Sequence, residues 1–166
     1  MLFNKNKIEF VFASETICGT TIDLLSQTYN EFKRNNKDEF ESWQPRWIDF
    51  DNIVYSNLER SKGFIIFTKI NNVIIGFVSW DPRNHPCARI GDNCIIPGFK
   101  GNGYGKLQLL NSIEYLDEKE YINIRVTTGT DEHFLPARKM YESCGFKIKG
   151  KFKGEYSELI DYELEL

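Results

Sequence analysis

The sequence predicts an α/β (α+β) fold in which one central, mixed but mostly antiparallel sheet of about seven strands is flanked by about four helices. Its 166 residues, of which 41% are hydrophobic and 14% aromatic, suffice for one compact core. Short apolar runs alternate with segments whose apolar residues recur every three or four positions. Because no repeat or linker divides the chain, residues 1–166 are expected to form one domain.

The first part of the chain is expected to run strand, helix, helix. Residues 8–13 form an apolar run typical of a strand. A helix with Thr20 or Thr21 as its cap follows, and a second helix is predicted over 51–60 with Asp51 as its cap. The inner face of this second helix is predicted at Ile53, Val54 and Leu58.

A hairpin is predicted next, because the turn Asn71-Asn72 separates two β-rich runs at 64–68 and 73–80. A further strand over 88–96 leads into a glycine-rich turn. The residues after that turn, 106–116, have the spacing of a helix.

The last part of the chain begins with a strand over 121–127, and the resulting strand-helix-strand unit is expected to be a right-handed parallel crossover. Pro136 suits the first turn of a short helix, and Gly145 suits its end. Two final strands fit 146–152 and 159–166.

Composition excludes several classes of function. A net charge of −3 and a pI near 5.5 argue against a nucleic-acid partner, which needs a clustered basic surface. The four cysteines have no C-x-x-C spacing, so no metal site is expected. No leader and no apolar run of the roughly 20 residues that cross a membrane occurs. We therefore expect a soluble, cytoplasmic protein without a membrane partner. The solvent-facing side of a late strand is predicted at Lys147, Lys149, Lys151 and Lys153.

Residues 100–105, Lys-Gly-Asn-Gly-Tyr-Gly, stand between a predicted strand and a predicted helix. That order presents backbone N–H groups to an anion at a helix N-terminus, so the turn predicts a bound phosphate or pyrophosphate. The glycines allow a close approach, and Lys100 and Lys106 add positive charge. A tight turn without a ligand is the alternative. A P-loop is excluded because Leu107 stands where a hydroxyl residue is needed for magnesium.

The same turn resembles the acyl-CoA signature of the GNAT superfamily of acyl-CoA-dependent N-acetyltransferases, (Arg or Gln)-x-x-Gly-x-(Gly or Ala), with Lys100 at the Arg/Gln position. The run 95–97 is similar to the end of that family's fourth strand. The block 127–146 is similar to its fifth strand, short helix and terminal Tyr-x-x-x-Gly-Phe. The order of elements agrees from residue 8 to residue 166, so the resemblance implies a GNAT-like fold.

The resemblance implies a sheet whose fourth and fifth strands splay apart, with the pantetheine arm of acetyl-CoA bonded to main-chain groups in the gap. It implies acetyl-CoA as the cosubstrate and no metal. For Arg138, contact with a CoA phosphate and plain exposure are equal alternatives. The residues implied to bind the cosubstrate are Cys94, Ile95, Lys100, Gly101, Asn102, Gly103, Tyr104, Gly105, Lys106, Ala137, Arg138 and Tyr141.

The resemblance also implies direct transfer of the acetyl group to a primary amine of a small molecule, a peptide or a protein. Tyr141 stands where the family has its proton donor for the departing thiolate, and packing in the core is its alternative role. Asp92 is our first candidate for the base and His133 the second, with a cap or surface contact as the alternative for His133. Strand alternation places Asp92 and Ile95 on opposite faces unless a bulge intervenes.

Acceptor specificity is expected to come from the first two helices, from a loop around Trp43 and Trp47, and from the loop between Trp80 and His85. Tryptophans more often close the core, which is the alternative reading. The rival function is a non-catalytic acyl-CoA-binding or regulatory module of the same fold. A further rival, nucleotide phosphoryl transfer, requires magnesium-dependent ATP binding. The acceptor's identity and a homodimer are left open.

Overall fold

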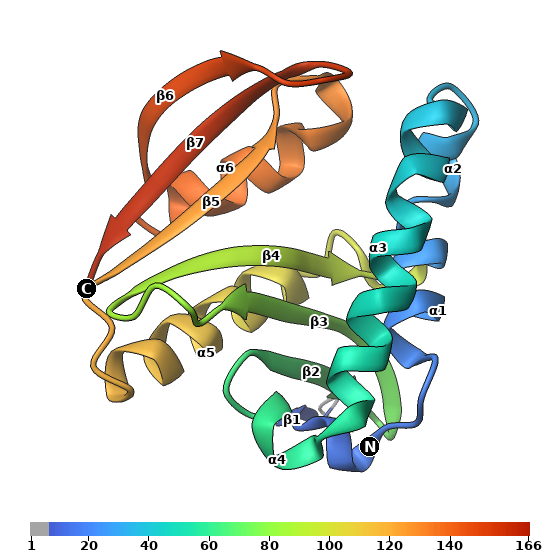
Figure 1. Cartoon of the computed structure of the whole chain (residues 1–166), viewed down its shortest axis with the longest axis vertical. Helices are drawn as coiled ribbons and strands as arrows, with labels where there is room; N and C mark the ends of the chain where they lie inside the picture. The colour runs from blue at the N-terminus through green and yellow to red at the C-terminus, as the bar shows by residue number, and fades with distance from the viewer. Residues whose placement is uncertain (1–6) are drawn as a thin grey trace, which may run out of the picture.

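The computed structural model describes residues 7–166, and seven strands in that range form one sheet (Figure 1). They are β1 (Ile8–Val11), β2 (Ile65–Ile70), β3 (Val73–Asp81), β4 (Cys87–Ile95), β5 (Asn123–Gly129), β6 (Lys147–Lys153) and β7 (Glu158–Glu165). Their order is β1-β2-β3-β4-β5-β7-β6. Only β4 and β5 pair in parallel. The mixed, mostly antiparallel sheet and its parallel crossover are therefore confirmed.

All helices of this range lie between strands in the chain order. The α-helices are α1 (Thr20–Thr28), α2 (Asn30–Lys33), α3 (Lys37–Ser56), α4 (Leu58–Ser61), α5 (Tyr104–Glu118) and α6 (Leu135–Ser143). Short 3-10 segments span Ala13–Glu15, Pro97–Phe99 and Glu132–Phe134. The number exceeds the predicted four because α2 and α4, of 4 residues each, stand beside the longer helices.

Two groups of buried side chains lie on the two faces of the sheet. One group packs α1 and α3 against it and includes Leu25, Trp47 and Phe77. The other packs α5 against the opposite face and includes Val78 and Leu109. The neighbours Phe77 and Val78 belong to different groups because successive side chains of a strand point to opposite faces. Figure 1 accordingly shows α3 in front of the strands and α5 behind them.

The predicted bounds 51–60 of the second helix are wrong. The helix in this part of the chain is α3, which begins at Lys37 and ends at Ser56. Pro45 lies inside it, and an internal proline is a sequence signal against a helix. The predicted inner face is right for Val54, which is buried, and wrong for Ile53 and Leu58, which are 50% and 40% exposed.

Asp51 is buried in the middle of α3 and caps a different helix from the one predicted. Its carboxylate accepts hydrogen bonds from the backbone N–H groups of Gly19 at 2.7 Å and Thr21 at 3.2 Å. The N-cap of α1 is Gly19, and its side chain offers no hydrogen bond, so neither Thr20 nor Thr21 is the cap. Asp51 thus satisfies the free N–H groups at the start of α1 from outside that helix.

Strands β4 and β5 are hydrogen-bonded over only part of their length. Cys87–Ile90 pairs with Asn123–Val126, and the pairing stops there. Beyond it, β4 continues against β3 to Ile95, and β5 continues against β7 to Gly129. Figure 1 shows the two strands diverging toward their C-terminal ends. The splayed pair expected from the family resemblance is therefore present in the fold.

A β-bulge lies in β4 just where it leaves β5. The register changes from Trp80↔Ile90 to Val78↔Asn93, so two residues, Gly91 and Asp92, stand opposite one residue of β3. The bulge moves Asp92 to the α1 and α3 face, whereas Ile90 belongs to the core on the α5 face. Alternation is regular from Asp92 onward, so Asp92 and Ile95 lie on opposite faces.

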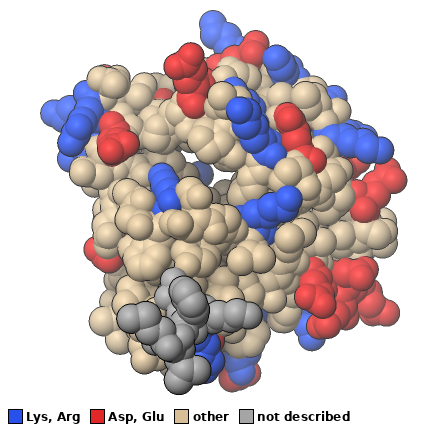
Figure 2. Space-filling view, turned by 180° about the vertical axis from the view of Figure 1, so that it is seen from behind, with Lys and Arg blue, Asp and Glu red and all other residues tan. Residues whose placement is uncertain are grey.

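Strand β6 and the face of the molecule opposite to Figure 1 both carry basic side chains. Strand β6 is exposed along its whole length, which confirms that its lysines face solvent. Figure 2 shows the side of the molecule opposite to Figure 1, where Lys and Arg side chains stand around a hollow near the centre. Within residues 7–166, no helix combines the length and the apolar character that spanning a membrane requires.

Candidate active site

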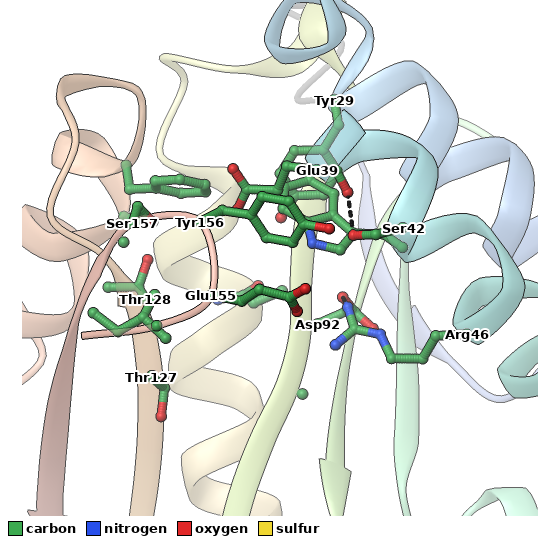
Figure 3. Close-up of a pocket in the computed structure, with 18 of the residues that line it drawn as sticks. Tyr29, Glu39, Ser42, Arg46, Asp92, Thr127, Thr128, Glu155, Tyr156 and Ser157 are labelled. Atoms are coloured by element: carbon green, nitrogen blue, oxygen red, sulfur yellow. Dashed lines mark hydrogen bonds and ion pairs between the residues drawn. The ribbon is translucent and has the colours of Figure 1, made fainter. Parts of the chain in front are cut away.

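A cavity of about 440 Å³ lies where β4 and β5 separate (Figure 3). Its walls come from α3 and from Tyr29, the C-cap of α1, on one side and from β5, α6 and the β6–β7 connection on the other, with β4 between them. This volume lies within the range of small-molecule sites. Two of the three predicted catalytic residues, Asp92 of β4 and Tyr141 of α6, line this cavity.

Asp92 lies beside Arg46 of α3 at this cavity. The Asp92 Oδ1 atom is 3.7 Å from Arg46 Nη2, and the Asp92 side chain is 16% exposed. The backbone N–H of Asp92 donates to Ser79 Oγ at 3.0 Å. Burial raises the pKa of the Asp92 carboxyl, and the Arg46 charge acts in the opposite direction. A carboxylate of raised pKa is a stronger proton acceptor than an ordinary one, as a general base requires.

Tyr141 reaches the cavity from α6 and is 5% exposed. Its ring packs against Phe146 at 5.5 Å and Tyr162 at 6.1 Å between centroids. Burial raises the pKa of the Tyr141 hydroxyl to about 12, while the Asn93 side chain acts to lower it. The hydroxyl is therefore protonated at neutral pH, as a proton donor must be. Tyr141 thus takes part in the core and lines the cavity as well.

A chain of buried polar side chains leads from β2 to this tyrosine. Thr68 Oγ1 donates to Gln108 Oε1 at 2.6 Å, and Gln108 Nε2 donates to the Phe77 carbonyl at 2.8 Å and to Asn93 Oδ1 at 2.6 Å. Because Asn93 Oδ1 accepts from Gln108, its amide nitrogen is left as a donor. That nitrogen is buried without a partner among the described residues. Asn93 lines the cavity beside Tyr141.

The glycine-rich turn joins the end of β4 to the start of α5. Gly101 and Gly103 both have φ of +79°, which favours glycine, and Gly103 is the N-cap of α5. A Cβ at Gly105 would lie 3.4 Å from Met140 Sδ and 3.6 Å from Ile95 Cγ1, so this position packs closely against β4 and α6. The predicted anion-binding geometry, a glycine turn at a helix N-terminus, is therefore in place.

Other predicted cosubstrate contacts differ in their surroundings. Lys100 Nζ donates to the Thr28 carbonyl at 3.4 Å, so its charge lies toward the end of α1. Cys94 is buried, and burial raises the pKa of its thiol to about 12. The Arg138 Nη1 group donates to the carbonyls of Gly129 at 2.8 Å and Asp131 at 2.9 Å. Arg138 thus stabilises the end of β5. This role is neither of the two alternatives given for it above, contact with a CoA phosphate or plain exposure.

His133, the second candidate for the base, is not among the residues that line the cavity. Its ring packs on Phe32 at 4.9 Å and Tyr29 at 6.3 Å between centroids. Partial burial, together with the Lys100 charge, lowers the pKa of the imidazole. Within residues 7–166, no group of three or more His, Cys, Asp or Glu side chains is arranged to hold a metal ion.

Sequence reasoning missed the wall formed by the β6–β7 connection, which contributes Glu155 and Tyr156. No local motif marks these residues, because only the folding of β7 back onto β5 brings them to the cavity. Glu39 of α3 was missed because that part of the helix was not predicted. The loop from Trp80 to His85 contributes nothing to the cavity, since it precedes the paired end of β4.

The sequence profile described as "Acetyltransferase (GNAT) family" matches residues 23–146, which is most of the chain and includes β4, the glycine turn and α6. The chain belongs to the GNAT family of acetyltransferases. The GNAT assignment from two sequence blocks is therefore confirmed, and with it membership of an acyltransferase family. No curated protein sequence gives a significant match.

Several solved structures share the GNAT fold with this chain. PaiA N-acetyltransferase from Thermoplasma acidophilum, in complex with coenzyme A, has a TM-score of 0.72 and 18% identity over 96% of this chain and 99% of that one. YncA from Salmonella typhimurium, with its cofactor acetyl-CoA, has a TM-score of 0.67 and 14% identity over 96% and 94%. The ribosomal-protein-S18-alanine N-acetyltransferase from Escherichia coli has a TM-score of 0.56 and 17% identity over 61% and 67%.

Proposed function

We propose that this GNAT protein transfers the acetyl group of acetyl-CoA to a primary amine. The observation that carries the proposal is the separation of β4 and β5 beyond Ile90 and Val126, directly before the glycine turn at the α5 N-terminus. The two elements together supply an extended slot and an anion site, and acetyl-CoA has an extended arm joined to a pyrophosphate. Two structures of the same fold contain coenzyme A or acetyl-CoA.

Main-chain groups of β4 and the glycine turn would bind acetyl-CoA. In this proposal the pantetheine arm lies along Cys94 and Ile95, where β4 has lost its β5 neighbour. The pyrophosphate then meets the turn over 100–105, where Lys106 adds positive charge, whereas Lys100 Nζ is directed to the Thr28 carbonyl. Ala137 and Tyr141 of α6 would border the thioester from the other side, since both line the cavity.

The proposed acetyl transfer gives Asp92 and Tyr141 one role each. Asp92 takes a proton from the ammonium form of the acceptor, which frees the nitrogen lone pair. The nitrogen attacks the thioester carbonyl carbon, the C–N bond forms, and the C–S bond breaks. Tyr141 gives its proton to the departing thiolate and regains one from the acetylated nitrogen, and Asp92 releases the proton that it took to solvent. The products are the N-acetyl amine and CoA.

We further propose that residues 1–166 act as one N-acetyltransferase-like domain in the cytoplasm, without a nucleic-acid partner. The single sheet that includes both ends of the described chain supports one domain. The four free cysteines are typical of a reducing compartment. The net charge of −3 supports the absence of a nucleic-acid partner.

Release of free thiol from acetyl-CoA, measured with a panel of amines, tests this function. Tyr141→Phe is expected to lower kcat by about 10²- to 10⁴-fold, the usual contribution of a positioned proton donor, with a smaller effect on KM. Tyr115→Phe is the matched control: it also removes a tyrosine hydroxyl, but that hydroxyl donates to the Lys62 carbonyl and is not part of the cavity.

One outcome replaces the proposal by its rival. If CoA binds but no amine in a wide panel accelerates thiol release, the protein is a non-catalytic acyl-CoA-binding module. If Tyr141→Phe and Tyr115→Phe both retain full kcat, the transfer stands but Tyr141 is not its proton donor.

A further inference from the structure

Given the proposed acetyl transfer, we propose that its acceptor is a small amine with a second positive charge, a diamine-type cation whose distal charge is held by Glu39, Glu155 and the aromatic wall of the cavity. The proposed function requires only one amino group near Asp92. The second charge is inferred from the part of the cavity that this reaction does not use.

The carboxylates of the cavity outnumber its basic groups. Glu39, Asp92 and Glu155 come from three different elements, and Arg46 is the one Lys or Arg among the described residues that line the cavity. Arg46 lies 3.7 Å from Asp92. Neither Glu39 nor Glu155 forms an ion pair with any residue in the range 7–166. Two carboxylates therefore face the cavity without a protein cation to balance them.

These two carboxylates reach the space from opposite walls. Figure 3 shows Glu155 extending from the β6–β7 connection toward Asp92 and Arg46, and Glu39 extending from α3 toward that connection. Desolvation raises the pKa of the Glu39 carboxyl, with the charge of Asp131 adding to the effect. A bound cation offsets both the desolvation and the repulsion from Asp131, because its charge stabilises the Glu39 carboxylate in place of water.

The aromatic wall has the composition of a cation site. Tyr29 and Trp43 lie 5.2 Å apart, Tyr29 and Trp47 lie 6.0 Å apart, and Trp43 and Trp47 lie 6.1 Å apart, all between ring centroids. All three rings and Tyr156 line the cavity. Ring faces attract ammonium groups, and most strongly when the site is shielded from water. The rings are packed before any ligand arrives, so little ordering is needed on binding.

The same wall contains an unused donor. Trp47 is 1% exposed, and its Nε1 has no hydrogen-bond partner among the described residues. A buried donor without a partner is costly unless a ligand or water supplies an acceptor. An amine substrate with a hydroxyl or amide oxygen between its two nitrogens would supply the hydrogen-bond acceptor for Trp47 Nε1. This feature points to a ligand in the cavity independently of the carboxylates.

A matched four-carbon series tests the distal charge: a straight-chain diamine, butylamine and the corresponding ω-amino acid, which differ only in the group at the far end. We expect kcat/KM to be at least about tenfold higher for the diamine than for butylamine, and lowest for the amino acid. Glu155→Gln is expected to reduce the ratio of diamine to butylamine several-fold, and Glu155→Asp to restore part of it. Glu41→Gln is the control, because Glu41 is on the same helix as Glu39 but outside the cavity.

The outcomes separate this inference from the proposed function. Equal kcat/KM for diamine and butylamine, or a ratio unchanged in Glu155→Gln, overturns the dication inference while the transferase stands. Preference for the amino acid overturns it in favour of a carboxylate held by Arg46. If no amine is turned over, the proposed function fails. Calorimetric titration of the diamine into the CoA-saturated protein then decides the cation site: binding weakened by Glu155→Gln supports the site, and absence of binding overturns it.

Discussion

Asp92 owes its place in the cavity to one extra residue in β4. Without the bulge at Gly91 and Asp92, strand alternation would put Asp92 on the same face as Ile90, in the core packed by α5. With the bulge it faces α3, where Arg46 lies 3.7 Å away. The backbone irregularity therefore moves this position from the buried core face to the cavity.

At the residue scale, Asp92→Asn is expected to lower kcat/KM for acetyl transfer by about 10²- to 10⁴-fold if Asp92 is the base. In the wild type the acidic limb of the pH profile of kcat/KM should lie above the ordinary aspartate range near pH ~4, because burial raises the Asp92 pKa. Thiol release measured across pH for both proteins checks this. Full activity of Asp92→Asn would assign proton removal to water or another group.

The same substitution has an expected effect on stability with a defined sign. A raised native pKa means that the native state binds the Asp92 proton more tightly than the unfolded state does. The free energy of unfolding therefore falls as pH rises from the unfolded pKa through the native one. An asparagine side chain does not ionise, so the free energy of unfolding of Asp92→Asn is not lowered by a buried charge. The variant should therefore unfold at a higher urea concentration than the wild type at neutral pH. The gain should vanish below the unfolded pKa of about 4, and a variant less stable at neutral pH contradicts this reasoning.

At the scale of elements, Gln108 fastens α5 to the centre of the sheet. Its side chain bonds Thr68 of β2, the Phe77 carbonyl of β3, and both Asn93 Oδ1 and the Cys94 carbonyl of β4. Three strands are thus fixed to the helix that follows the glycine turn. The same contacts fix β4 at the point where β5 has left it, so the slot keeps its width without a neighbouring strand.

Gln108→Leu is expected to lower the free energy of unfolding by about 2–4 kcal/mol, because buried groups of Thr68, Phe77 and Asn93 lose their partner. Gln44→Leu, the same change at an exposed position of α3, is the control and should stay within about 0.5 kcal/mol of the wild type. Urea denaturation measures both. Equal stability of the two variants would contradict the fastening role.

Elements whose signals are local were predictable from sequence. Periodicity and turn residues located the hairpin of β2 and β3, the strand before the glycine turn, and α5. The first half of α3 was not predictable in this way, because Pro45 argues against a helix that packing of Phe40 and Trp47 nevertheless stabilises. The role of Asp51 was equally hidden, since its partners at the start of α1 lie 30 or more residues away.

At the scale of the whole molecule, the two proposed substrates bind in regions of opposite charge. The glycine turn is followed by Lys106, which suits a pyrophosphate, whereas the cavity carries Glu39, Asp92 and Glu155, which suit an amine. The two regions meet along the end of β4. Lys106 and Glu39 belong to segments far apart in the chain, so this separation is a property of the folded molecule.

The cosubstrate side of this arrangement could be predicted and the acceptor side could not. The glycine turn and Tyr141 stand in contiguous blocks that resemble the GNAT family, so they were found without a structure. Glu155, Tyr156 and Glu39 come together only through the sheet order in which β7 lies between β5 and β6. Their contribution depends on tertiary placement, which no spacing rule encodes.

A crystal structure of the protein with acetyl-CoA would show whether the gap between β4 and β5 is the cosubstrate site. We expect the pantetheine arm in the gap between β4 and β5, bonded to main-chain groups near Cys94 and Ile95, with the pyrophosphate on the turn over 100–105 and the thioester beside Tyr141. Acetyl-CoA bound elsewhere, or β4 and β5 hydrogen-bonded beyond Ile90 and Val126 with no space between them, would contradict it.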